Sequence, residues 1–193
     1  NTYQQIASLK TIGNQELTWE HSDMLNLGLD VKVLNSRLNF TGEYYIKNTK
    51  DILLEMPVPL EYGFGKPNMN VGEVRNKGWE LSLSWNDRIN DFGYSISGNL
   101  SDNRNEVVDL GDTGPWKGSN TYTEVGLPFN SIYGYESMGL FQSDEEVANA
   151  PFQNSNTAAG DIRYKNQNGD DKIDANDRVV IGDPNPHFLY GVN

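Results

Sequence analysis

The sequence predicts an all-β fold made of antiparallel strands. Three observations predict it: apolar and polar residues alternate with a period of two in four segments, short connections join these segments in pairs, and a long connection separates the pairs. A large transmembrane β-barrel shows this alternation with its apolar face in lipid. A soluble β-sandwich shows it with its polar face in water, so the pattern alone leaves both architectures open.

The first two strands are predicted on either side of a short connection at Asn35 and Ser36. Apolar residues alternate from Leu25 to Val33 before it and from Leu38 to Ile46 after it. Two alternating segments joined by so few residues are typical of a β-hairpin.

A second hairpin is predicted from the alternation in Trp79–Trp85 and Tyr94–Leu100, which flank a polar turn at residues 87–91. The two Trp residues share a face about 15 Å apart along the normal of a tilted barrel, less than the band of about 25 Å. We therefore assign one to an aromatic girdle and the other to the middle of the band. Residues 56–70 contain three Pro residues and are predicted to form a long loop.

The 76 residues from 111 to 186 lack a clean long strand and exceed the usual length of a connection, so they are expected to be functional or partly folded. Ser143 and Glu146 indicate a capping box that opens a short helix, which stops by Pro151. If the strands on either side of this segment run in opposite directions, it contributes an even number of barrel strands, and zero is the simplest choice. Its aromatic residues either stack on sugars or pack the segment's own small core.

The predicted organisation has four parts. Residues 1–18 are a loop or the end of a preceding strand, 19–110 hold the two hairpins, 111–186 form the long loop region with the helix, and 187–193 start the next strand. The sequence starts at Asn1 without Met or a signal-like segment, and the alternation continues to Val192 and Asn193, so we interpret the chain as truncated at both ends.

Composition excludes several classes of protein. The chain has 15 Lys and Arg against 27 Asp and Glu, a net charge of −12, which argues against nucleic-acid binding. The absence of Cys excludes disulfides and thiolate sites. His21 and His187 lie in no nucleophile motif, so no catalytic residue is assigned and the chain is predicted not to be an enzyme.

An acidic loop carries the one chemical motif. Six residues fall at places 1, 3, 5, 7, 9 and 12 of a loop like that of an EF-hand: Asn166, Asn168, Asp170, Lys172, Asp174 and Asp177. Oxygen ligands at alternate positions suit a structural calcium ion, with Lys172 serving through its carbonyl. Two departures are the neutral Asn at place 1 and Asp171 at place 6, where Gly is usual. The alternative is a turn whose side chains cap its own backbone.

Several longer segments resemble SusC/RagA-type TonB-linked outer-membrane proteins. They are residues 13–20 (GNQELTWE), 26–30 (NLGLD), 44–53 (YYIKNTKDIL), 70–80 (NVGEVRNKGWE), 160–164 (GDIRY), the acidic loop and 177–186 (DRVVIGDPNP). The resemblance implies a late C-terminal part of a plugged barrel of roughly 22 strands. This part would comprise about four strands, long extracellular loops and the start of a fifth strand.

The resemblance also implies a function. A barrel of this type lies in the outer membrane in contact with its lipid, and imports oligomeric nutrients, glycans or peptides, together with a SusD-type surface lipoprotein. Energy comes from the TonB complex through parts outside this chain. The alternative is a secreted, calcium-stabilised β-sandwich that binds a glycan or a protein. The two differ in whether the apolar strand faces meet lipid or a shared core.

Overall fold

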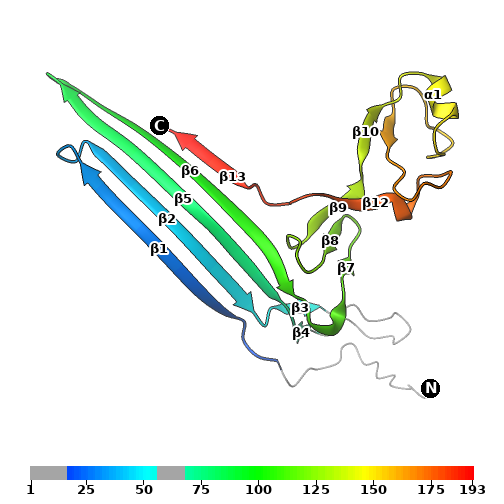
Figure 1. Ribbon diagram of the computed structural model, residues 1–193, viewed down its shortest axis with the longest axis horizontal. Coiled ribbons are helices and arrows are strands. Elements are labelled where there is room, and N and C mark those ends of the chain that lie inside the picture. Colours follow the sequence, from blue (N-terminus) through cyan, green and yellow to red (C-terminus); the bar gives the residue numbers. More distant parts are fainter. Residues whose placement is uncertain (1–16, 56–67) are drawn as a thin grey trace, which may run out of the picture. The chain divides into compact units, whose positions relative to one another are not determined.

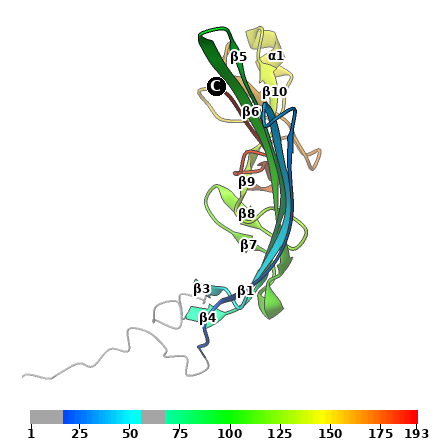
Figure 2. The same ribbon diagram turned by 90° about the vertical axis from the view of Figure 1, so that its left-hand side faces the viewer.

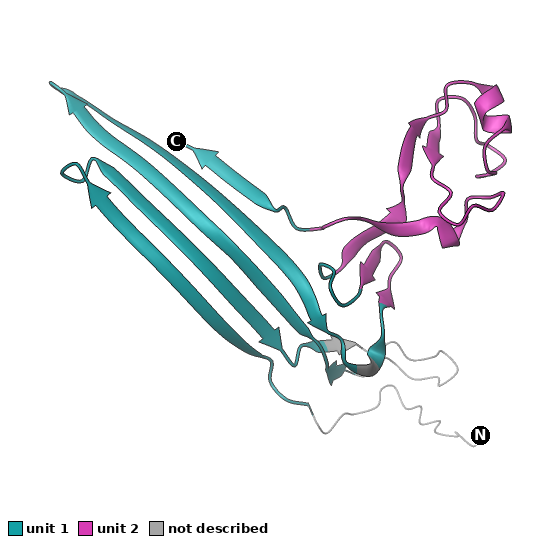
Figure 3. Cartoon of the chain, in the orientation of Figure 1, with its two compact units in different colours: residues 1–115, 124–129, 185–193 teal, residues 116–123, 130–184 magenta. Residues whose placement is uncertain are grey.

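The computed structural model describes residues 17–55 and 68–193 (Figure 1). The chain forms two compact units: unit 1 takes residues 1–115, 124–129 and 185–193, and unit 2 takes residues 116–123 and 130–184 (Figure 3). The predicted loop at residues 56–67 and most of the segment predicted at 1–18 lie outside the described residues.

Unit 1 is built on one five-stranded sheet in the order β1-β2-β5-β6-β13. The strands are β1 (His21–Val33), β2 (Leu38–Lys50), β5 (Glu73–Ile89), β6 (Phe92–Asp109) and β13 (Phe188–Val192), and every neighbouring pair is antiparallel. Both predicted hairpins are confirmed. Seen after a turn of 90°, the sheet is a single curved layer (Figure 2).

The sheet also shows how the long segment before β13 is accommodated. Strand β13 pairs directly with β6, with Leu189 opposite Ser101 and Gly191 opposite Asn99. The residues between these two strands therefore add no strand to the five-stranded sheet, as the topology argument predicted.

In the described part of unit 1, a second sheet has two strands, β3 (Leu53–Glu55) and β4 (Asn68–Asn70). The sequence placed residues 68–70 in a loop, and this was wrong. The Asn70 side chain donates to the Asp51 carbonyl at 2.8 Å, and the Val71 N–H donates to the Ile52 carbonyl at 3.0 Å. These bonds hold the two short segments together where Pro-rich composition suggested only a connection.

The buried apolar residues of unit 1 gather where β5 begins and β6 ends. Val74, Val107 and Leu110 are buried there. The Val107 backbone exchanges hydrogen bonds of 2.8 and 2.9 Å with Leu127 and Gly126. The core is small, so packing in a protein interior does not account for most of the sheet's apolar residues.

Unit 2 contains a four-stranded sheet, β12-β9-β8-β7, and a two-stranded sheet, β10-β11. The bounds are β7 (Trp116–Lys117), β8 (Thr121–Thr123), β9 (Ser131–Tyr135), β10 (Ser137–Leu140), β11 (Ile162–Tyr164) and β12 (Arg178–Gly182). The region expected to be partly folded is thus a compact unit of short strands.

The predicted helix is α1 (Asp144–Ala148). The Ser143 hydroxyl accepts the Glu146 N–H at 3.2 Å, and the Glu146 carboxylate accepts the Gln142 N–H at 2.9 Å. The first bond satisfies an amide group that the first turn leaves without a helical partner. The second reaches Gln142, one residue before the N-cap, rather than the Ser143 N–H that a capping box would use. Within the described ranges, no helix is long and apolar enough to cross a membrane.

Candidate functional site

The apolar face of the five-stranded sheet is continuous from strand to strand. Residues directly opposite each other in an antiparallel pair point to the same side, so the register joins them into rows. Four rows define the apolar face: Leu27, Tyr44, Trp79, Asp102 and Phe188; Leu29, Gly42, Leu81, Leu100 and Tyr190; Val31, Phe40, Leu83, Gly98 and Val192; Val33, Leu38, Trp85 and Ile96. Asp102 is its one charged member.

The apolar face is exposed in this chain. The exposed fractions of Leu27 and Leu29 are 61% and 59%, and Leu83 and Ile96 are also exposed. The other sheet of unit 1 has only three residues in each strand, too few to cover this surface. The β-sandwich alternative requires a second sheet packed over the apolar face, and the described residues of unit 1 do not provide one.

Aromatic side chains border the apolar face at both ends. At the end near the long connections, the rings of Trp79 and Phe188 have centroids 6.5 Å apart. At the hairpin end, Phe92 stacks on Tyr94 with centroids 6.3 Å apart, and the Trp85 indole N–H donates to the Tyr94 hydroxyl at 3.4 Å.

Trp79 and Trp85 are too close together to mark both edges of an apolar band, and Phe92 lies farther from Trp79 than Trp85 does. Phe92 pairs with Ile89, ten positions beyond Trp79 on the same face. Ten residues span about 33 Å along a strand, or about 25 Å along the normal at a tilt near 40°, which is the height of the apolar band of outer-membrane barrels. Phe92 was not assigned to a border from the sequence because residues 87–91 were predicted to form the turn, whereas β5 continues to Ile89 and pairs there with Phe92.

The opposite face of the sheet is polar. Thr41 donates to Asp30 at 2.7 Å, and the Asn105 amide donates to Asn76 at 2.8 Å. On the same face, the Tyr45 hydroxyl donates to Asn103 at 3.1 Å. Such a face suits contact with water, as in the lumen of a barrel.

The six residues of the acidic loop are organised mainly by bonds to their own backbone. Asn166 accepts the Gly169 N–H at 2.6 Å, Asp170 accepts the Lys172 N–H at 2.9 Å, and Asn168 accepts the Asp170 N–H at 3.0 Å. The Asn166 amide also donates to the Asp170 carbonyl. These are the contacts expected of a turn whose side chains cap its own backbone.

Asp177 is fully buried and ties the two ends of the acidic loop together. One carboxylate oxygen accepts the Gln167 N–H at 2.8 Å and the other accepts the Asp174 N–H at 2.8 Å. Asp174 in turn caps the 3₁₀ turn Ala175–Asp177. The spacing placed Asp174 and Asp177 in one loop but gave no sign that Asp177 would be buried.

Lys172 and Asp174 form an ion pair of 2.6 Å within the acidic loop. The hydrogen bond from Lys172 holds the pKa of the Asp174 carboxyl below its ordinary value, and the Asp174 carboxylate raises the pKa of Lys172. Folding lowers the pKa of the Asp174 carboxyl, so the ion pair stabilises the loop at pH values above the ordinary pKa of aspartate. This stabilisation is lost as the pH falls through the lowered pKa.

Across residues 17–55 and 68–193, no three His, Cys, Asp or Glu side chains lie close enough to hold a metal ion. A calcium site of the predicted kind would also use the amide oxygens of Asn166 and Asn168 and the carbonyl of Lys172. The oxygen set fits calcium chemistry, but both Asp177 oxygens already accept amide protons. Calcium binding therefore stays a prediction.

The aromatic residues of unit 2 pack mainly against one another and against cations. Tyr122 stacks on Tyr133 with centroids 5.3 Å apart, and Tyr135 lies 5.2 Å from Tyr164. The Arg178 guanidinium lies 4.7 Å from the Tyr133 centroid. These contacts support the interpretation in which the tyrosines form the small core of this segment.

The comparisons with known proteins agree with this geometry. Residues 1–183 match the family model described as TonB dependent receptor-like, beta-barrel. TonB-dependent receptor P39 of Formosa agariphila is 33% identical over 93% of this chain and 21% of its own length. TonB-dependent receptor SusC of Bacteroides thetaiotaomicron is 27% identical over 100% of this chain and 19% of its own length.

Among solved structures, the chain is similar to one titled "Structure of the RagAB peptide transporter". The TM-score is 0.78 and the identity 26%, over 100% of this chain and 21% of that one. The chain thus spans about a fifth of the length of the relatives it matches. TonB-dependent receptors are transporters and not enzymes, in keeping with the expectation from the two His residues. The chain belongs to the TonB-dependent receptor β-barrel family and is of the SusC/RagA type.

Proposed function

We propose that this chain is a section of the wall and outer loops of a TonB-dependent importer in the outer membrane. The observation that carries the proposal is the two-faced sheet, with one aromatic-bordered apolar face and one polar face. The apolar face contacts lipid and the polar face lines the lumen. Strands β1 and β13 are the sheet's two edges and continue the wall through neighbours supplied by the rest of the barrel.

The ends of the strands set the orientation. The turns after β1 and β5 are short, whereas the connections after β2 and β6 are long. Outer-membrane barrels have short turns on the periplasmic side and long loops outside. The region from 111 to 186 is therefore extracellular in this proposal.

The imported substrate is an oligomeric nutrient, a glycan or a peptide, captured together with a SusD-type surface lipoprotein. The similarity of this chain to the receptor SusC and to the RagAB peptide transporter supports this part of the proposal. TonB contacts belong to parts of the receptor outside this chain.

The test is made on the whole receptor expressed in its host. We expect it in the outer-membrane fraction, with heat-modifiable migration in gels, and to co-purify with a lipoprotein. Import is then measured with labelled oligosaccharides and labelled oligopeptides, of which one class is expected to depend on the receptor gene. A receptor found only in the soluble fraction would contradict the proposal.

A structural calcium ion in the acidic loop is a further part of the proposal. Calcium is expected to raise the melting temperature of the purified receptor, because bound ligand stabilises only the folded loop. The double substitution Asp170→Ala and Asp174→Ala should abolish that rise. The matched control is Asp144→Ala in α1, which should preserve it. If the unaltered receptor shows no rise, the loop is a plain capped turn.

A further inference from the structure

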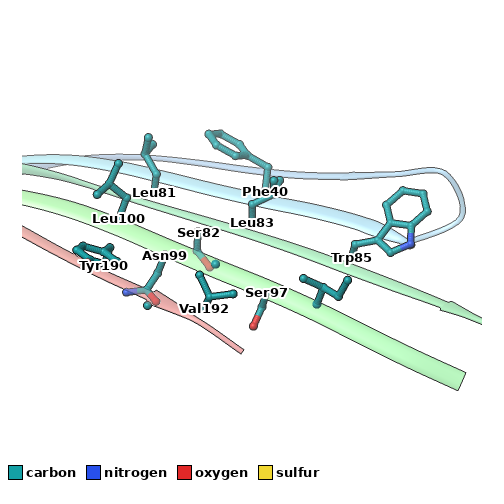
Figure 4. Close-up of a pocket in the computed structure, with 13 residues that line it drawn as sticks. Phe40, Leu81, Ser82, Leu83, Trp85, Ser97, Asn99, Leu100, Tyr190 and Val192 are labelled. Atoms are coloured by element: carbon teal, nitrogen blue, oxygen red, sulfur yellow. The ribbon is translucent and has the colours of Figure 1, made fainter.

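The apolar face carries a groove on its β6-β13 side. The groove is open to the surface and has a volume of about 510 Å³; its lining includes Ile96. Leu83, Leu100, Tyr190 and Val192 also line it (Figure 4). Gly98 lies between Leu83 and Val192 in one row of the register. Because Gly98 has no side chain, this row has a gap, and the groove lies at that gap.

Two adjacent cations form the first row beyond the aromatic border of the same face. Lys77 and Arg104 are opposite each other on β5 and β6, one row outside Trp79, and both are exposed. They stand at the end of the strands that leads to the long connections. The same face carries Asp102 one row inside this pair and the opposed residues Arg75 and Glu106 one row outside it, so the patch holds three cations and two anions on a chain with a net charge of −12.

Arg104 is held in place by its neighbours. Its Nε donates to both carboxylate oxygens of Asp102, at 3.0 and 3.1 Å, and its guanidinium lies 5.9 Å from the centroid of Phe188. Asp102 offsets part of the positive charge. Lys77, on the neighbouring strand, adds the second cation to a guanidinium whose position is already fixed.

The spacing of the cations and the groove matches a lipid. Lys77 and Leu83, the partner of Gly98, are six positions apart, which is about 20 Å along a strand or about 15 Å along the membrane normal at a tilt near 40°. One leaflet of a bilayer has a hydrocarbon depth of about 15 Å. A phosphate held between Lys77 and Arg104 would thus leave an acyl chain long enough to pass Trp79 and enter the groove at Gly98.

We propose that this surface is a binding site for one outer-leaflet lipid with an anionic, phosphate-bearing headgroup, with the phosphate at Lys77 and Arg104 and an acyl chain in the Gly98 groove. The inference rests on the proposed function, which places the apolar face in the membrane and the two cations at its outer side. Charge complementarity selects an anionic lipid, since phosphate oxygens form charge-assisted hydrogen bonds with Lys and Arg.

The test uses the whole receptor in detergent, titrated with diphosphoryl lipid A and followed by native mass spectrometry. The variant Lys77→Gln with Arg104→Gln should bind lipid A at least about tenfold more weakly, because each cation near an anionic lipid surface contributes about 1 kcal/mol. Lys77→Arg with Arg104→Lys should retain binding. Lys47→Gln, on the polar face of neighbouring β2, is the matched control and should have no effect.

Two further measurements separate headgroup from acyl chain. Gly98→Leu should fill the groove and weaken binding, and its Cβ meets only the Gly191 carbonyl oxygen at 3.6 Å, an ordinary contact. Monogalactosyldiacylglycerol, which has no phosphate, should bind weakly to every variant. Equal binding of the two lipids, or wild-type affinity in the double Gln variant, would overturn the proposal.

Heat-modifiable migration of each variant separates this inference from the proposed function. Variants that assemble normally but bind lipid A like the wild type refute the lipid site and leave the importer standing. An unaltered receptor that never reaches the outer membrane refutes the proposed function instead.

Discussion

Replacing Leu29 by Arg is expected to block assembly of the receptor in the outer membrane. Leu29 lies in the row with Gly42 and Leu81, inside the apolar band, and its side chain is exposed. An Arg at the middle of the bilayer costs about 2 to 4 kcal/mol. The measurement is the amount of heat-modifiable receptor in the outer-membrane fraction.

The matched control for Leu29→Arg is Asn26→Arg on the polar face of the same strand. Asn26 donates to Glu43 at 3.5 Å, so an Arg there gains a carboxylate neighbour in a wet environment. Normal assembly of Asn26→Arg with loss of Leu29→Arg supports a lipid-facing Leu29. Normal assembly of both variants would count against it.

Replacing Gly78 by Ala is expected to destabilise the barrel wall strongly. Tyr45, directly opposite on β2, lies across Gly78 on the polar face. A Cβ at this position would lie 2.8 Å from the Tyr45 hydroxyl oxygen and 2.9 Å from Cζ, and closer still to the Asp102 carbonyl oxygen. Backbone must shift to relieve such contacts, and overpacking of this kind costs about 1 to 3 kcal/mol.

The readout for Gly78→Ala is the urea midpoint of the purified receptor. Gly98→Ala on neighbouring β6 is the control, since its added methyl group makes only an ordinary contact. Adding Tyr45→Ala to Gly78→Ala should recover part of the lost stability by removing the ring. An unchanged midpoint in Gly78→Ala would show that the close Tyr45 packing is absent.

The sequence predicted the central part of the sheet well because one physical constraint acts there. Residues 25–33 and 38–46 alternate because apolar side chains gather on one face of the sheet and polar side chains on the other. The strands are longer than the segments in which apolar and polar residues alternate. β5 begins at Glu73 rather than Trp79, because backbone pairing with β2 and β6 continues where apolar and polar residues no longer alternate.

The strands of unit 2 were not predicted from the sequence, for a different reason. Its strands have two to five residues, too few for a period of two to be recognised. Pairs such as Arg178 with Tyr135 join residues far apart in the sequence, and no local pattern marks them. The acidic loop was found because its residues are close in sequence, whereas the burial of Asp177 depends on the fold around it.

The most direct test of the central claim is the environment of each face. This chain contains no Cys, so in a receptor whose other Cys residues are replaced by Ser, single Cys residues can be introduced at Leu27, Leu83 and Ile96 on the apolar face and at Asn26, Ser82 and Ser97 on the polar face. After spin labelling of the whole receptor in lipid vesicles, collision with oxygen reports lipid and collision with a water-soluble nickel chelate reports water. We predict oxygen accessibility at the first three positions and nickel accessibility at the last three. Nickel accessibility at both sets, or apolar positions closed to both reagents as in a packed core, would contradict the account.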